Sequence, residues 1–186
     1  RRGRGPRARR ASDQALIRQV KDDLRAWRLG RVVWVADRGF ESAQNRRYLQ
    51  RAGGHYILGE KLRGDSAEAG AALSRQGRYH TVAGNLEVKE VVIDDGTMRD
   101  RFVICRNPQE AERDALVRGQ LLEQLDVMIK GSDELEPKAR DAIACRVRAK
   151  PGLARFLRVT AKGLLRVDRA AVAAEAHLDG KFLLRT

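Results

Sequence analysis

One stretch constrains the fold of this chain more than any other: the apolar run Val32–Ala36 and the Asp37-Arg38-Gly39 that ends it. The run lacks the polar alternation of a half-exposed strand, so it predicts a strand buried on both faces. Open α/β sheets build their sites at the carboxyl ends of their strands. Asp37 is therefore the first candidate for a chemical role. The structural alternative is that its carboxylate caps the turn or helix that follows.

The elements around this strand alternate between helix and strand. Helical spacing from Ser12 predicts a helix that Gly30 closes, and a second helix is expected over 42–51. Another short apolar strand follows at His55–Leu58. Helix, strand, helix, strand is typical of a largely parallel sheet covered by helices, so the sequence predicts an α/β fold.

The pattern changes after Gly59 and indicates a mixed α and β region. Three strands are expected in an antiparallel meander, at Tyr79–Val82, Leu86–Ile93 and Arg101–Cys105. Asn107, Pro108 and Glu110 predict the start of a helix that ends at Gly131, and another helix ends before Pro151. A strand over 164–167, a short helix opened by Asp168, an Asp179-Gly180 turn and a strand over 181–185 complete the pattern.

The charge of the chain favours a polyanionic partner. Lys and Arg number 38 against 25 Asp and Glu, a net charge of +13. Six arginines lie in the first ten residues, so the remaining chain still carries +7. A body that stays basic is a reasonable partner for nucleic acid. We expect residues 1–11 to be disordered, either as an arm that contacts DNA or as a misread start of the reading frame.

Composition also argues against other classes of protein. No apolar run approaches the ~18 residues of a spanning helix, and the arginine-rich start has no apolar signal segment. We therefore expect no membrane attachment and a cytoplasmic location. The two cysteines and three histidines are scattered without metal-ligand spacing, which gives a zinc site little support.

Several blocks in order resemble the DDE transposases of bacterial insertion sequences. The first is Val-Trp-Val-Ala-Asp-Arg-Gly-Phe followed by Asn45–Leu49, which looks like the block around the second catalytic aspartate. Gly53–Leu62, Leu164–Asp168 and Asp179–Thr186 are similar to later blocks of one large group of that family. The resemblance implies a partial RNase H-like core with an inserted α+β region. The implied divisions are a disordered arm over 1–11, core over 12–59, insertion over 60–178 and a returning core strand over 179–186.

The same resemblance implies metal-dependent cleavage and joining of DNA at transposon ends, usually with Mg²⁺. Asp37 matches the second aspartate of the catalytic triad and would be a metal ligand. The first aspartate and the glutamate of the triad have no counterpart in the sequence. We therefore expect a partial transposase that does not cleave DNA by itself. Its sheet would lack its opening hairpin strands, which exposes apolar edges that favour aggregation or pairing with a partner.

Five basic residues are the candidate contacts to the DNA backbone. Arg38, Arg46 and Arg47 follow the Asp37 strand, and Lys61 and Arg63 follow the next strand. The alternative for Arg46 and Arg47 is the solvated face of a helix. Two other functions stay open: a basic DNA-binding module without catalysis, and a decayed remnant of a transposase. The expected partners are DNA, a second copy of the chain or a full-length transposase, near the bacterial nucleoid.

Overall fold

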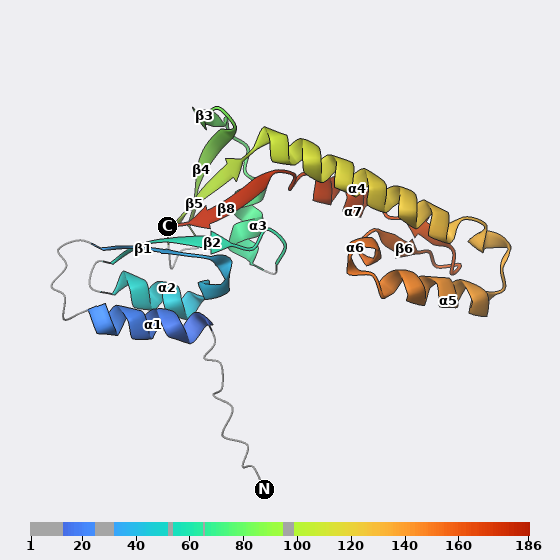
Figure 1. Cartoon of the computed structure of the whole chain (residues 1–186), viewed down its shortest axis with the longest axis horizontal. Helices are drawn as coiled ribbons and strands as arrows, with labels where there is room; N and C mark the ends of the chain where they lie inside the picture. The colour runs from blue at the N-terminus through green and yellow to red at the C-terminus, as the bar shows by residue number, and fades with distance from the viewer. Residues whose placement is uncertain (1–12, 25–31, 52–53, 65, 95–98) are drawn as a thin grey trace, which may run out of the picture. The chain divides into compact units, whose positions relative to one another are not determined.

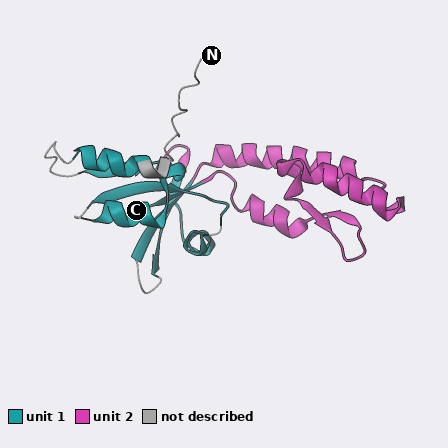
Figure 2. Ribbon diagram, turned by 90° about the horizontal axis from the view of Figure 1, so that it is seen from below, with its two compact units in different colours: residues 1–82, 87–105, 182–186 teal, residues 83–86, 106–181 magenta. Residues whose placement is uncertain are grey.

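A computed structural model describes residues 13–24, 32–51, 54–64, 66–94 and 99–186. These residues form an α/β structure in two compact units, shown in Figure 2. Unit 1 comprises residues 1–82, 87–105 and 182–186, and unit 2 comprises residues 83–86 and 106–181. The expected arm over 1–11 and the expected helix end at Gly30 lie outside the described residues. No helix in the described part of the chain is long and apolar enough to cross a membrane.

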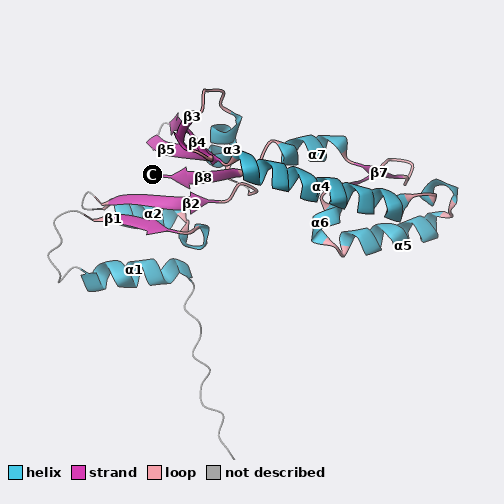
Figure 3. Cartoon of the chain, turned by 45° about the horizontal axis from the view of Figure 1, so that its top comes forward, coloured by secondary structure: helices cyan, strands magenta, loops and turns pink. Residues whose placement is uncertain are grey.

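Unit 1 is built on a six-stranded sheet in the order β1-β2-β8-β5-β4-β3, drawn in magenta in Figure 3. The strands are β1 (Val33–Ala36), β2 (His55–Glu60), β3 (His80–Ala83), β4 (Leu86–Asp94), β5 (Arg99–Arg106) and β8 (Lys181–Arg185). β1 and β2 are parallel, whereas β2 and β8 are antiparallel. The sheet is therefore mixed and not largely parallel as expected. The last strand, β8, pairs with β2 and so belongs to the main sheet.

The expected burial of β1 on both faces is wrong. Trp34 and Ala36 pack against the core, but the alternate residues Val33 and Val35 are 48% and 74% exposed. β1 lies at one end of the strand order, and helices cover one of its faces. The apolar run therefore predicts the strand correctly, but it does not predict that one face of the strand is exposed.

Two helices cover β1 and β2 on one face, as Figure 1 shows: α1 (Asp13–Asp23) and α2 (Ala43–Gln50). Ser42 caps α2 by accepting a hydrogen bond from the backbone N–H of Asn45 at 3.1 Å, which confirms the predicted start of this helix. The core beneath them consists of Ile17, Leu49, Tyr56 and Leu58, with Trp34, Ala36 and Phe40 packed against it. Unit 1 also contains α3 (Ala67–Ser74), which the sequence analysis did not predict.

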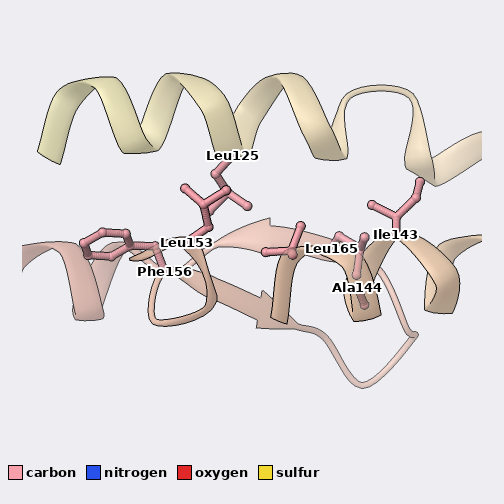
Figure 4. Close-up of a cluster of buried hydrophobic side chains, with 7 residues drawn as sticks. Leu125, Ile143, Ala144, Leu153, Phe156 and Leu165 are labelled. Atoms are coloured by element: carbon pink, nitrogen blue, oxygen red, sulfur yellow. The ribbon is translucent and has the colours of Figure 1, made fainter. Parts of the chain in front are cut away.

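Unit 2 has a hydrophobic core of its own. Its elements are α4 (Pro108–Ile129), η3 (Ser132–Glu134), α5 (Pro137–Arg148), α6 (Pro151–Ala154), β6 (Leu157–Val159), β7 (Leu165–Val167) and α7 (Arg169–Ala176). Asn107 and Asp168 cap α4 and α7 as expected. The buried core residues, most of them labelled in Figure 4, are Leu125, Ile143, Ala144, Val147, Leu153, Phe156 and Leu165.

Unit 2 is inserted between two paired strands of unit 1. Arg101 in β5 and Thr186 after β8 exchange backbone hydrogen bonds of 3.3 and 2.9 Å, the pattern of an antiparallel pair. The ladder continues to the backbone N–H of Asn107, which donates to the carbonyl of Gly180 at 2.8 Å. The expected insertion over 60–178 thus differs from the observed division. β3, β4 and β5 belong to the main sheet, and the separate body lies within 106–181.

Candidate nucleic-acid interface

Asp37 lies at the carboxyl end of β1, as the sequence predicts, and is exposed. The parallel register pairs Ala36 with Leu58, so the next residues, Asp37 and Gly59, are neighbours across β1 and β2. A Cβ atom on Gly59 would lie 3.5 Å from Asp37 Oδ1 and 3.0 Å from the Arg38 nitrogen. Glycine at this position therefore lets the backbone of β2 approach the turn that holds Asp37.

The carboxylate of Asp37 has a structural function. Asp37 is the N-cap of η2 (Arg38–Phe40), and its Oδ1 accepts a hydrogen bond of 2.7 Å from the Arg38 N–H. Mg²⁺ sites for phosphoryl transfer use two or more carboxylates. Among the described residues no group of three or more His, Cys, Asp or Glu could hold a metal ion. The described residues therefore provide no site of three such ligands around Asp37, and its capping role is the one the geometry supports.

Three of the predicted DNA contacts follow the two parallel strands. Arg38 is the second residue after β1, and Lys61 and Arg63 follow β2. All three are exposed. Because β1 and β2 are parallel, Arg38, two residues after β1, and Lys61, directly after β2, lie at the same edge of the sheet as Asp37. We call Asp37, Arg38 and Lys61 the strand-end group.

Arg46 occupies a different environment and cannot contact DNA as predicted. It is 8% exposed, its Nη1 forms an ion pair with Glu41, and Glu60 Oε1 lies 4.0 Å away. Burial lowers the pKa of Arg46, and the nearby charge of Arg185 lowers it further. A phosphate contact would require this side chain to leave its acidic partners, so we remove Arg46 from the candidate contacts.

Arg46 belongs to a buried charge cluster that the sequence analysis missed, formed by Arg46, Glu60, Asp100 and Arg185. Arg185 pairs with Asp100, lies 3.3 Å from Glu60 and stacks 5.0 Å from the centre of the Phe102 ring. Burial raises the pKa of Glu60, while Arg185 opposes that rise. The alternation of β2 could have indicated the burial of Glu60, because Glu60 lies on the same face of the strand as the buried Tyr56 and Leu58.

Arg47, the neighbour of Arg46, faces a cavity instead. The cavity has a volume of about 200 Å³ and is lined by Arg18, Gln44, Arg47, Tyr48 and Arg51. We call it the arginine pocket. The sequence analysis missed Arg18 and Arg51. Arg47 and Arg51 are four residues apart, a spacing that places two side chains on the same face of a helix. No pattern near Arg18 in the sequence indicates that it joins them, because it lies on another helix.

Comparison with known proteins gives no relative: no protein-family model, no curated protein and no solved structure matches this chain.

Proposed function

We propose that this chain binds DNA and is related to the DDE transposases of bacterial insertion sequences. The observation that supports it most is the strand-end group. An exposed aspartate and two exposed cations follow the carboxyl ends of two parallel strands, where α/β sheets place their ligands. Arg38 and Lys61 can each meet a backbone phosphate, which gives affinity without reading sequence. The surplus of cations over the whole chain favours the same partner.

An RNase H-like core is part of the proposal. Its support is the parallel pair β1 and β2 under two helices, the aspartate after β1 and the return of β8 to the same sheet. On this proposal Asp37 is one metal ligand of a site that needs further carboxylates, and this chain does not cleave DNA by itself. A second copy or a full-length transposase is then the expected protein partner.

A DNA-binding module without catalysis is the second candidate. The capping role of Asp37 favours it, because the carboxylate already accepts the Arg38 N–H. The two candidates share DNA binding and differ in the role of Asp37.

Fluorescence anisotropy with a labelled DNA duplex tests the shared claim. The chain should bind DNA, with affinity falling steeply as salt rises. Replacing Arg38 and Lys61 by Gln should weaken binding and reduce the slope of log affinity against log salt by about 2. The matched control replaces the exposed Arg158 and Lys162 of unit 2 by Gln and removes the same charge. Equal effects of the two double variants would contradict the strand-end group as the contact.

A nicking assay on supercoiled DNA with Mg²⁺ tests the proposed inertness of the chain. The purified chain should leave the DNA intact under either candidate. Nicking that Asp37→Ala abolishes would contradict the proposed inertness and establish Asp37 as catalytic.

Thermal unfolding tests the remaining alternative, a decayed remnant that does not fold. Such a remnant would give no cooperative thermal transition, so a clear melting midpoint counts against that alternative.

A further inference from the structure

The arginine pocket brings three guanidinium groups from two helices to one small cavity. Arg18 comes from α1, while Arg47 and Arg51 come from α2 and the residue that caps it. Gln44 and Tyr48 complete the lining, and no acidic side chain is among the described residues that form it. A cavity with three cations and two neutral hydrogen-bonding groups is suited to an anion.

Helix position alone does not explain this arrangement. Cations near the end of α2 are favoured by the helix dipole, which accounts for Arg47 and Arg51 separately. Like charges four residues apart nevertheless repel each other on a helix. Arg18 adds a third positive charge from α1, and the dipole of α2 does not explain why this arginine lines the same cavity.

The walls of the pocket are held in place by polar contacts between the two helices. Arg18 Nε donates to Oδ1 of the fully buried Asn45 at 3.3 Å, and Asn45 Nδ2 donates to the carbonyl of Phe40 at 2.9 Å. One edge of the Arg18 guanidinium is thereby anchored beside the cavity that this residue lines.

Further contacts join α1 to α2 beside Tyr48, another residue of the pocket lining. Lys21 Nζ donates to the carbonyls of Tyr48 at 2.8 Å and Leu49 at 3.2 Å. The hydroxyl of Tyr48 donates to Asp22. These contacts join α1 to the last turn of α2, so the arginines are presented by a supported scaffold. A preorganised site loses less conformational entropy when it binds.

We propose that the arginine pocket binds a single phosphate group, held by Arg18, Arg47 and Arg51. Guanidinium groups match phosphate geometry because their N–H groups can donate two parallel hydrogen bonds to its oxygens. A phosphate of the DNA backbone and a free phosphate compound share this chemistry. The proposal deepens the proposed function, because the backbone phosphate is the source that DNA binding would supply.

Two titrations of the full chain test the pocket. In the first, inorganic phosphate is added at constant ionic strength while the Nε–Hε resonances of the arginines are followed by ¹H–¹⁵N NMR. Phosphate should shift the resonances of Arg18, Arg47 and Arg51, and chloride should not.

The second titration measures DNA binding. Arg47→Gln combined with Arg51→Gln should weaken DNA binding by about tenfold, the effect of losing a charged hydrogen bond. The Arg158→Gln and Lys162→Gln control should change it much less.

The outcomes separate the pocket from the proposed function. Phosphate shifts with unchanged DNA affinity in the pocket variant support the anion site and overturn the DNA backbone as its source. DNA binding by the wild-type chain without phosphate shifts, and without an effect of the pocket variant, overturns the pocket and leaves the proposed function standing. Phosphate shifts in a chain that does not bind DNA support the pocket and overturn the proposed function.

Discussion

At the scale of single residues, Asp37 has a structural role that substitution can measure separately from any chemical one. Its Oδ1 accepts the Arg38 N–H at 2.7 Å and caps η2. We expect Asp37→Ala to lower the free energy of unfolding by about 1 kcal/mol, because it removes the cap. Asp37→Asn should cost less, because an amide oxygen accepts the same bond. Urea denaturation of the two variants checks this. Equal losses would show that charge, and not the hydrogen bond, carries the effect.

Glu60 gives a second residue-scale prediction, concerning pH. Burial raises its pKa above the ordinary value of 4.5, so the folded chain binds this proton more readily than the unfolded chain. The resulting stability is present below about pH 4.5 and is lost as pH rises through the raised pKa. The free energy of unfolding of the wild type relative to Glu60→Gln should therefore fall as pH increases through that window, measured by urea denaturation.

Glu90 provides the matched control with the opposite sign. Its hydrogen bond from Arg101 lowers its pKa, so its contribution is present above the ordinary value and lost as pH falls. The stability of the wild type relative to Glu90→Gln should thus rise with pH. Parallel pH dependence of the two comparisons would contradict the assigned burial of Glu60.

The site could be predicted only in part at this scale. The position of Asp37 followed from a local pattern, since an apolar run that ends in a carboxylate places it at the end of a strand. Arg46 and Arg47 are adjacent and identical in type, yet one is buried and the other is exposed. Arg46 pairs with the nearby Glu41, but its other acidic neighbour, Glu60, lies on the next strand of the sheet. A local pattern does not contain such partners.

At the scale of elements, β1 combines a buried and an exposed face. We expect Val35→Lys to change the free energy of unfolding by less than about 0.5 kcal/mol, because Val35 is 74% exposed. A lysine on an edge strand should also weaken self-association through this strand. Sedimentation velocity and urea denaturation measure the two effects. The matched change Leu58→Lys, at a residue with no exposure, should prevent folding; a similar loss in Val35→Lys would contradict the exposed face.

Gly180 precedes β8 at a position that both its backbone conformation and its close neighbours restrict to glycine. Its φ is +62°, and a Cβ atom there would lie 2.3 Å from the carbonyl oxygen of Asn107 and 2.6 Å from the nitrogen of Ala111. We expect Gly180→Ala to lower the free energy of unfolding by about 3 kcal/mol or more. Gly131→Ala is the control, with φ +72° and nothing within 4 Å. It should cost about 1 kcal/mol, from the backbone alone. Denaturation of both variants isolates the steric part.

Element types were more predictable than their partners. Ser42, Asn107 and Asp168 cap the helices that they were expected to open, because capping depends on neighbouring residues in the chain. The joining of β3, β4 and β5 to the main sheet was not predicted, because β8 completes the connection from the far end of the sequence. Sheet order is a long-range property and left no local signal.

At the scale of the whole molecule, the two units have separate cores. Leu125 is fully buried in unit 2, so Leu125→Ala should destabilise that unit by about 2–5 kcal/mol. Amide hydrogen exchange should then accelerate in β7 and change little in β2. The matched variant Leu58→Ala, in the core of unit 1, should give the reverse pattern. Equal acceleration in both units for either variant would show that the chain unfolds as one cooperative body.

The ladder between β5 and β8 has a consequence for how such a chain can diversify. Since the backbones of Asn107 and Gly180 are already hydrogen-bonded to each other at 2.8 Å, the segment between them takes the place of what would otherwise be a short hairpin loop. The length and sequence of this inserted segment can be exchanged with little demand on the strands that carry it. Such an insertion could be gained, lost or exchanged during evolution while the same sheet is retained.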